Sequence, residues 1–437
     1  MRPFVLLALS TATLAAGAAH AQVRTGAAAF GGWKDDAPGV ARRFVPGDFA
    51  APGPAQGPNG AHQERQADPV PPKAPPGFKV ELFAKGLNRP RTLRYAPNGD
   101  LFLAEMGSGK ILVFKGGSAA APPTVFAEGL NRVTGLLFYP ASDPKWLYVG
   151  VADKVLRIPY SAGAPAGAAE TLVSGIRTED HFNRDLAIAP DGKHILLGIG
   201  SGSNVAEGMG PKPADFKGDG LGAAWGVEEN RAVVRIMDPD GKNARNYITG
   251  IRNCTAMARQ PGSANIWCVV NERDEIGDNT PPEYATAIKA GAYYGWPWYT
   301  PLNQEDPRRA GERPDLKGKV TVPDVLFQPH SAPLGIAFYS GSQFPSDYRG
   351  DAFVTFRGSW NRTDRTGYKV VRMRFAGGKP TGEYDDFLTG FVLDAKNVWG
   401  RPVGVIGAPD GSLLVGEDGS GTLWRITWTG AKQQASR

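Results

Sequence analysis

Histidine, arginine and asparagine side chains recur at one position of a repeated pattern. Each stands a few residues upstream of a turn that joins two apolar segments. The set consists of Arg91, Asn131-Arg132, Asp180-His181, Arg252-Asn253, His330 and Arg401. Two further polar groups, Asn271-Glu272-Arg273-Asp274 and Arg357–Arg362, follow the second apolar segment of a pair. If the fold gathers these positions, they form a strongly cationic site with few carboxylates.

Arginines that converge on one site repel each other and lose hydration unless an anion lies among them. A planar polyanion held by bidentate guanidinium contacts would satisfy them. The alternative is that each arginine pairs with a nearby aspartate or glutamate. The small number of carboxylates in equivalent positions favours the anion site.

His181 is the predicted general base of this site. Its imidazole titrates near neutral pH, and the preceding Asp180 is placed to fix its tautomer. The other histidines beyond the N-terminal segment are His62, His194 and His330. His62 lies in a Pro-rich segment and His194 in a turn, where both would be solvated. The alternative for His181 is a purely structural role.

Other chemistries lack their motifs. The chain has no paired histidine spacing or cysteine cluster for zinc, no Gly-rich loop between a strand and a helix, and no Gly-x-Ser-x-Gly nucleophile motif. The net charge is +6, but lysine and arginine are scattered among almost as many carboxylates. Nucleic acid is therefore not expected as a partner.

The elements that would position these residues are six similar hairpins. Three of their turns are nearly identical: Ala96-Pro97-Asn98-Gly99, Ala189-Pro190-Asp191-Gly192 and Ala408-Pro409-Asp410-Gly411. The hairpins repeat at roughly 40–90 residues, and further strands follow them. This predicts an all-β fold, a six-bladed β-propeller of four-stranded antiparallel blades over residues 77–437. The first strand of each blade would line the channel, so the polar residues before it would meet at one mouth. A pair of β-sandwiches is the alternative.

The N-terminal region divides into two parts. Residues 1–21 begin Met-Arg, continue with an apolar stretch and end in Ala19-His20-Ala21, which is typical of a signal peptide. No later run reaches the ~18 apolar residues of a membrane span. The mature protein is therefore expected to be soluble and periplasmic. Residues 22–76 are rich in Ala, Pro and Gly and are expected to form an extended leader that either wraps the propeller or stays mobile.

The two cysteines, Cys254 and Cys268, flank a predicted hairpin. In an oxidising compartment they could form a disulfide across paired strands. The alternative is two small buried apolar residues.

Several motifs in order resemble the PQQ-dependent glucose/sorbosone dehydrogenase family, especially its sorbosone or pyranose dehydrogenase branch. They are Leu-Asn-Arg-Pro-Arg with Ala-Pro-Asn-Gly-Asp (87–100), Gly-Ile-Arg-Asn (250–253), Val-Asn-Glu-Arg-Asp-Glu-Ile-Gly-Asp (270–278), Tyr-Gly-Trp-Pro (294–297), Ala-Pro-Leu-Gly-Ile-Ala-Phe-Tyr (332–339), Gly-Ser-Trp-Asn-Arg (358–362) and Gly-Arg-Pro-Val-Gly-Val (400–405). The similarity extends from about residue 33 to the end of the chain.

The resemblance implies a six-bladed propeller that binds pyrroloquinoline quinone (PQQ) and Ca²⁺ at the top of its channel. His181, with Asp180, would be the catalytic base. The cofactor-binding residues would be Arg91, Arg252, Asn253, Asn271, Arg357 and Arg401. The backbone carbonyls of Glu272 and Arg273 would bind the metal, as suits a hard cation. Arg357 departs from the family, which commonly has Lys or His there.

The expected function is a periplasmic dehydrogenase that oxidises an aldose or aldehyde sugar to a lactone or acid. Electrons would pass through PQQ to a soluble acceptor such as a cytochrome c. Two alternatives remain on the same architecture: a calcium-dependent lactonase and a noncatalytic sugar-binding propeller. The Arg-rich inventory at the mouth disfavours the lactonase, whose metal would need several carboxylates and amides.

Overall fold

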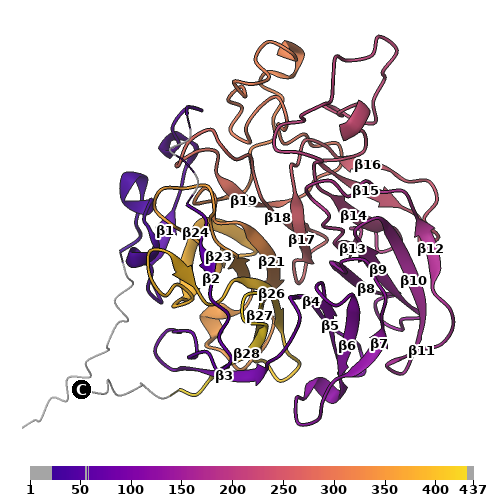
Figure 1. Cartoon of the computed structure of the whole chain (residues 1–437), viewed down its shortest axis with the longest axis vertical. Helices are drawn as coiled ribbons and strands as arrows, with labels where there is room; N and C mark the ends of the chain where they lie inside the picture. Colours follow the sequence, from indigo (N-terminus) through magenta and orange to yellow (C-terminus); the bar gives the residue numbers. More distant parts are fainter. Residues whose placement is uncertain (1–21, 55–56, 58, 431–437) are drawn as a thin grey trace, which may run out of the picture.

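The computed structural model describes residues 22–54, 57 and 59–430. The predicted signal peptide, residues 1–21, lies outside this range. Six four-stranded antiparallel sheets form a ring (Figure 1). The first strands of the sheets contact one another in a closed circle, β4, β8, β13, β17, β21, β26 and back to β4. The predicted six-bladed β-propeller is therefore confirmed.

The blades follow the chain in order. Blade one contains β4 (Pro90–Tyr95), β5 (Leu101–Glu105), β6 (Lys110–Phe114) and β7 (Thr124–Ala127), and blade two β8 (Gly135–Tyr139), β9 (Trp146–Val151), β10 (Lys154–Ser161) and β12 (Glu170–Val173), with the short β11 (Ala164–Pro165) also on β10. Blade three contains β13 (Leu186–Ile188), β14 (Ile195–Ile199), β15 (Val233–Met237) and β16 (Arg245–Ile248), and blade four β17 (Cys254–Arg259), β18 (Ile266–Val270), β19 (Glu283–Ala287) and β20 (Val325–Phe327). Blade five contains β21 (Pro333–Phe338), β22 (Ala352–Phe356), β23 (Lys369–Ala376) and β24 (Lys379–Leu388), and blade six β26 (Pro402–Gly407), β27 (Leu413–Glu417), β28 (Thr422–Trp428) and β3 (Phe78–Ala84).

The repeated tetrapeptide makes the same turn three times. The amide of the final glycine donates to the carbonyl of the first alanine in each, for example Gly99 to Ala96 at 2.9 Å. That glycine has a φ of 85°, 73° and 85° in the three turns, the left-handed region that glycine adopts without a steric penalty. Proline suits the second position because its fixed φ matches the turn. The repeated tetrapeptide in the sequence therefore corresponds to a repeated backbone turn in the structure.

The two ends of the propeller meet in blade six. Its outer strand, β3, comes from the start of the propeller and pairs with β28 from the C-terminal end, with Phe78 opposite Trp428. This pairing closes the ring, and aromatic contacts between the two rings pack over it.

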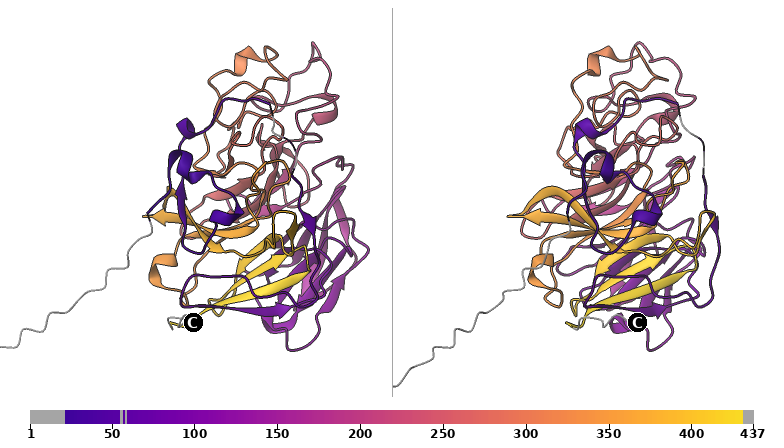
Figure 2. Two further views of the ribbon diagram at one scale, coloured as in Figure 1. Left: turned by 60° about the vertical axis from the view of Figure 1, so that its left-hand side comes forward. Right: turned by 90° about the vertical axis from the view of Figure 1, so that its left-hand side faces the viewer.

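The segment 22–76, called the strap below, packs against the propeller where it is described (Figure 2). Its strand β1 (Ala41–Arg43) extends blade five beyond β24, and β2 (His62–Gln63) pairs in parallel with β25 (Asn397–Val398). The amide of Asn59 donates to the carbonyl of Trp360, and that of Gly53 to Ile276. The sequence left open whether this segment wraps the propeller or stays mobile, and the described part of it wraps the propeller.

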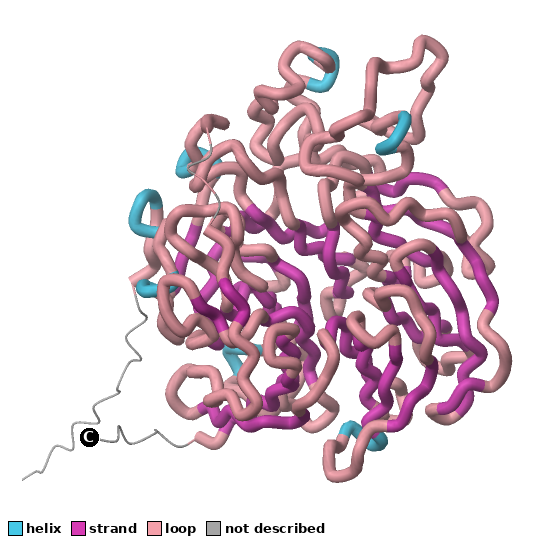
Figure 3. Tube along the Cα trace, viewed as in Figure 1, coloured by secondary structure: helices cyan, strands magenta, loops and turns pink. Residues whose placement is uncertain are grey.

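Loops outnumber helices around the strands (Figure 3). The described helical elements are 3-10 turns of three or four residues, from Gly26–Ala29 to Ser346–Tyr348. Within the described residues, no helix is long and apolar enough to span a membrane. Two long loops rise from blades three and four and bury a core of their own around Trp225 and Trp298, with ring centroids 5.4 Å apart. In blade four, Cys254 and Cys268 form a disulfide, with their Cα atoms 5.8 Å apart.

Candidate active site at the mouth of the propeller

A cavity of about 390 Å³ opens where the blades converge. Five of the six blades contribute to its wall. It is lined by Arg89, Arg91, Met106, His181, Phe182, Arg252, Asn271, Glu272, Asp274, Glu283, His330, Ala332, Leu334, Arg357, Gly358, Trp360 and Asp418. Of the ten residues to which the resemblance assigned a role, six share this wall: Arg91, His181, Arg252, Asn271, Glu272 and Arg357. Asp180, Asn253, Arg273 and Arg401 do not line it.

Strand ends place these side chains. Asn271 directly follows β18, Arg357 directly follows β22 and Asp418 directly follows β27. The first strands of blades one, four, five and six each shift register within their first three residues, as between Cys254 and Ala256. Such bulges increase the local twist and change the direction of side chains. They occur in the four blades that supply the arginines of the site.

Two arginines form ion pairs with Asp418, and a third, Arg91, is close enough to feel the charges of Asp418 and Arg357; we call Arg91, Arg357, Arg401 and Asp418 the mouth cluster. The Nε atoms of Arg357 and Arg401 lie 3.0 and 2.8 Å from the two carboxylate oxygens of Asp418. The Nη atoms of Arg357 and Arg401 make no hydrogen bond to any described residue, and Arg357 faces the cavity. Arg91 reaches only the amide oxygen of Asn183, at 3.5 Å. The cluster therefore carries a surplus of positive charge beside an open cavity.

Electrostatics reflect this surplus. Burial lowers the pKa of Arg91 to about 10, and Asp418 opposes that effect while Arg357 adds to it. Burial, and repulsion from Arg357, also lower the pKa of Arg401 despite its contact with Asp418. Guanidinium groups remain charged at neutral pH. The lowered pKa values of Arg91 and Arg401 therefore reflect the unfavourable free energy of their positive charges at this site. A bound anion would relieve that cost.

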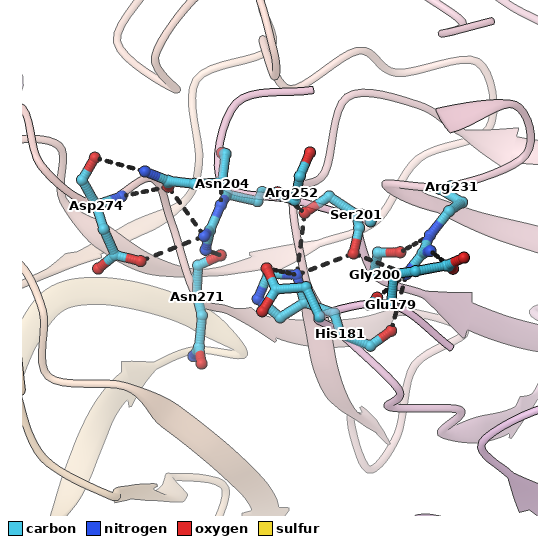
Figure 4. Close-up of polar contacts among 12 residues, drawn as sticks. Glu179, His181, Gly200, Ser201, Asn204, Arg231, Arg252, Asn271 and Asp274 are labelled. Atoms are coloured by element: carbon cyan, nitrogen blue, oxygen red, sulfur yellow. Dashed lines mark hydrogen bonds and ion pairs between the residues drawn. The ribbon is translucent and has the colours of Figure 1, made fainter. Parts of the chain in front are cut away.

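Arg252 differs from the arginines of the mouth cluster, because its guanidinium donates hydrogen bonds to several protein groups (Figure 4). It donates to the carbonyl of Glu272 at 2.5 Å, to both oxygens of Asn204 at 3.1 and 3.2 Å, and to Asp274 at 3.3 Å. Although burial opposes it, hydrogen bonding from His330 and the charge of Arg252 keep the pKa of Asp274 below its usual value. Arg252 thus braces the blade-four wall and adds positive charge to it.

His181 is held in a single tautomer. Its Nδ1 lies 3.1 Å from the carbonyl oxygen of Ser201 and 3.0 Å from the Ser201 hydroxyl. That hydroxyl donates its own proton to the carbonyl of Ser203, at 2.7 Å. Both Ser201 atoms can therefore only accept, so Nδ1 must carry the proton and Nε2 keeps its lone pair.

The imidazole of His181 is also kept neutral. Burial, and next the positive charge of Arg252, lower its pKa to about 3. Asp180 is half-exposed, has a positive φ of 50°, and its carboxylate lies 3.4 Å from Nδ1. Ser201 is closer to Nδ1 than Asp180 is, and it supplies the contacts that define the tautomer.

Buried acidic groups form the floor beside Arg252. The amide of Glu272 donates to Glu283 at 3.0 Å. Burial raises the pKa of Glu272 to about 8 and that of Glu283 well above its usual value. One carboxylate oxygen of Glu272 is buried and has no hydrogen-bond partner among the described residues, and the same holds for the side-chain oxygen of Asn253. These acceptors, together with the backbone carbonyl of Glu272 that accepts from Arg252, are the kind of oxygen donors that a hard cation prefers.

Arg273 sends its side chain away from the cavity to Asp306, with Nε 2.5 Å from a carboxylate oxygen. Only its backbone could therefore serve a metal at the mouth. Among the described residues, no three His, Cys, Asp or Glu side chains are grouped to hold a metal ion. A cation here would depend on carbonyl oxygens and on oxygens of a bound ligand.

Sequence reasoning missed Ser201, Asp418 and Glu283. The signal for Asp418 was present, because it follows β27 just as Asn271 follows β18 and Arg357 follows β22. Ser201 lies two residues beyond β14, in a Gly- and Ser-rich stretch that resembles an ordinary loop. Glu283 begins β19, a strand that no turn motif announces. Trp360, half-exposed at the rim, completes the set of side chains at the opening.

Comparisons with known proteins agree with this geometry. A PQQ-dependent pyranose dehydrogenase from Coprinopsis cinerea is 24% identical over 80% of this chain, and the match spans 54% of that protein, about half of its length. The solved PQQ domain of the Coprinopsis cinerea pyranose dehydrogenase, in its holo form, has a TM-score of 0.67 at 20% identity and covers 83% of this chain and 98% of the domain. A calcium structure of a Trichoderma reesei enzyme of carbohydrate-active family AA12 has a TM-score of 0.66 at 21% identity and covers 84% and 100%.

These matches confirm the resemblance to PQQ-dependent sugar dehydrogenases that the motifs indicated, whereas the sorbosone-type branch stays a prediction. The family model described as TrAA12-like matches residues 72–285 and 309–429, which together make up most of the propeller. The chain belongs to the TrAA12-like family.

Proposed function

We propose that this protein is a periplasmic PQQ-dependent dehydrogenase that oxidises an aldose or aldehyde sugar, of the pyranose or sorbosone type, to a lactone or acid. The observation that carries the proposal is the mouth cluster: three arginines, one aspartate and guanidinium Nη atoms without a described protein partner, beside a cavity of about 390 Å³. PQQ is a planar tricarboxylate, and such a group matches this surplus of positive charge.

Arg91, Arg357 and Arg401 would hold the carboxylates of PQQ, and Asn253 and Asn271 would contact it from blade four. Calcium would bind to PQQ and to the carbonyls of Glu272 and Arg273, near the unpartnered oxygen of Glu272. When bound, PQQ would supply the two-electron oxidant that the protein side chains lack. The calcium structure of a family AA12 enzyme supports the choice of metal.

His181 would accept the proton of the sugar hydroxyl that is oxidised, and bound PQQ would supply the acceptor for the hydride of the carbon that bears this hydroxyl. Its Nε2 is suited to this role because the contacts of Nδ1 with Ser201 leave the Nε2 lone pair free. Arg252 and the mouth cluster would stabilise the negative charge that develops during the transfer. Electrons would then leave through a soluble acceptor such as a cytochrome c.

The test is a titration of the purified apo-protein with PQQ and Ca²⁺, followed by a dye-coupled panel of aldoses. The proposal expects stoichiometric uptake, and sugar-dependent bleaching of the quinone absorbance. His181→Asn should keep the uptake and lower the rate about 10²–10⁴-fold, the usual contribution of a general base. Absence of uptake at micromolar PQQ with Ca²⁺ present would overturn the proposal. A parallel assay of lactone hydrolysis without PQQ would identify a lactonase instead.

A further inference from the structure

Arg231 is a buried arginine that lies behind His181 and outside the cavity at the mouth. It stands two residues before β15, and its side chain is 3% exposed. Its guanidinium donates to four backbone carbonyls and one carboxylate, and every acceptor belongs to one of two segments that flank His181 (Figure 4). The acceptors are Gly200 O at 3.0 Å, Ser201 O at 2.8 Å, His181 O at 3.1 Å, Glu179 O at 2.7 Å and Glu179 Oε2 at 3.1 Å.

One of these acceptors also contacts the imidazole. The carbonyl oxygen of Ser201 accepts from Arg231 and from Nδ1 of His181. A carbonyl oxygen has two lone pairs, so both are used, and the direction of this carbonyl is fixed by two donors. Arg231 therefore stabilises the acceptor that keeps the proton on Nδ1.

The same guanidinium holds the backbone of the base itself. The carbonyl of His181 accepts from Arg231 and from Arg184, both at 3.1 Å. The preceding residue, Asp180, has a φ of 50°, which a residue other than glycine keeps only where surrounding contacts enforce it. Without Arg231, the carbonyls of Glu179, Gly200 and Ser201 would lose a buried donor, and the segment would have to rearrange to satisfy them.

We propose that Arg231 is a positioning residue of the reaction: by holding the carbonyls of His181 and Ser201 it fixes the Nδ1-protonated tautomer of His181 and leaves Nε2 free for the cavity. This inference rests on the proposed function in so far as His181 is the base. Its structural part, the control of the tautomer, does not depend on the substrate.

Arg235 provides a matched control. It lies on β15 and lines, together with Arg231, a second cavity of about 410 Å³ between blades two and three. Its one hydrogen bond to a described residue goes from Nη2 to the carbonyl of Ala244, at 2.8 Å. Arg235→Met therefore removes a partly buried arginine from the same strand region without touching the segments around His181.

The experiment compares Arg231→Met and Arg231→Lys with Arg235→Met. The first measurement uses ¹⁵N-histidine NMR on the apo-protein, with His181→Asn to assign the signal. In the wild type and in Arg235→Met, His181 should show one neutral tautomer, protonated on Nδ1. In Arg231→Met, the signal should become an average of two tautomers. Lysine keeps the charge but lacks the planar fork, so Arg231→Lys should show the mixture as well.

The second measurement is steady-state kinetics with PQQ, Ca²⁺ and an aldose. Arg231→Met should lower kcat about 10²-fold, as small displacements of catalytic groups do, with KM and PQQ uptake within about twofold of the wild type. A single wild-type tautomer and an unchanged kcat in Arg231→Met would overturn the inference. If Arg231→Met does not fold, a wild-type tautomer in Arg231→Lys would overturn it equally. If the wild type oxidises no sugar, the proposed function fails, and the NMR result alone decides the role of Arg231.

Discussion

Two clusters of cations and aspartates in this molecule differ in charge balance: one is neutral and the other is positive. The first joins the strap to blade five and is called the strap cluster: Arg42, Lys369, Asp36 and Asp386. Its four ion-pair distances lie between 2.7 and 2.9 Å, and no side chain in it is more than 7% exposed. Two cations meet two carboxylates there, so the cluster is neutral and dry.

The mouth cluster also combines cations with aspartate, but its charges are not balanced. Arg357 and Arg401 share Asp418, Arg91 has no ion pair with a described residue, and the side chains of Arg357 and Arg401 are 34% and 23% exposed. They contact the aspartate through Nε, which leaves their Nη ends without a described protein partner. Charge balance therefore distinguishes a structural cluster from a binding cluster. A balanced, closed cluster fastens elements together, whereas a surplus of one charge beside a cavity marks a binding site for the opposite charge.

The largest effect should come from breaking the strap cluster. Arg42→Met leaves Asp36 and Asp386 with one cation between them, and removal of one partner from a buried ion pair costs about 3–5 kcal/mol. We expect the free energy of unfolding, measured by urea denaturation, to fall by that amount. PQQ uptake by the folded protein should be unchanged. A loss of less than about 1 kcal/mol would mean that the strap is fastened by its other contacts instead.

The same substitution at the mouth should behave in the opposite way. Arg401→Met removes a surplus charge, so the free energy of unfolding should change by less than about 1 kcal/mol. The Kd for PQQ should rise about 10–100-fold, because a hydrogen bond to a charged group contributes about 1.5–3 kcal/mol. Both quantities can be measured on one preparation, by denaturation and by fluorescence titration. Equal stability losses in Arg42→Met and Arg401→Met would remove the distinction between the clusters.

The burial of His181 beside Arg252 should also be visible in the pH dependence of stability. The pKa of His181 is lowered to about 3 by burial and by Arg252, whereas an unfolded histidine titrates near 6.5. Between these values the unfolded chain binds a proton that the folded protein refuses. Stability is therefore complete above pH 6.5 and falls as the pH is lowered toward 3, by up to about 1.4 kcal/mol per pH unit.

His181→Asn should remove this contribution. Denaturation curves at pH 7, 6 and 5 should show a smaller loss of stability in the variant than in the wild type. Parallel losses in both proteins would show that His181 is protonated in the folded state, and that the arginines do not affect it as argued.

Much of the fold could be predicted because short, local sequence patterns determine the turns and strands of each blade. The three Ala-Pro-Asn/Asp-Gly turns reflect a glycine with positive φ, and the six apolar hairpins, of which these three are the most alike, indicated the number of blades. The ring then brought Arg91, His181, Arg252 and Arg357 to one cavity, since the starts of the first strands and the ends of the second strands lie on the same side of the ring. Position within a repeat predicted these four correctly, but it did not distinguish them from Asn131, Arg132, Asn253 and Arg401, which stand at equivalent positions and do not line the cavity.

The partners of those residues could not be predicted in the same way. Asp180 precedes His181 in the chain and was expected to fix its tautomer, yet Ser201, 20 residues away, is closer to Nδ1. Arg231 is 50 residues from His181 and supports it through backbone carbonyls, which carry no sequence signal. The contacts of the strap could not be predicted either. Its low-complexity composition gives no sign that Arg42 pairs with Asp386, or Asp36 with Lys369, each more than 300 residues away along the chain.

The smallest effect is expected at a third kind of arginine–aspartate pair, which tests whether contact alone matters. Arg425 and Asp410 form a 2.5 Å pair at the opposite end of the blade-six hairpin, but their side chains are 31% and 49% exposed. Water screens such a pair, and its net contribution is typically about 0–1 kcal/mol. Arg425→Met should therefore change neither the free energy of unfolding beyond that range nor the Kd for PQQ. The same arginine-to-methionine change would then give three results, a loss of stability at Arg42, a loss of cofactor affinity at Arg401 and neither at Arg425. A stability loss at Arg425 comparable to that at Arg42 would show that contact distance, and not burial with charge balance, determines what these clusters contribute.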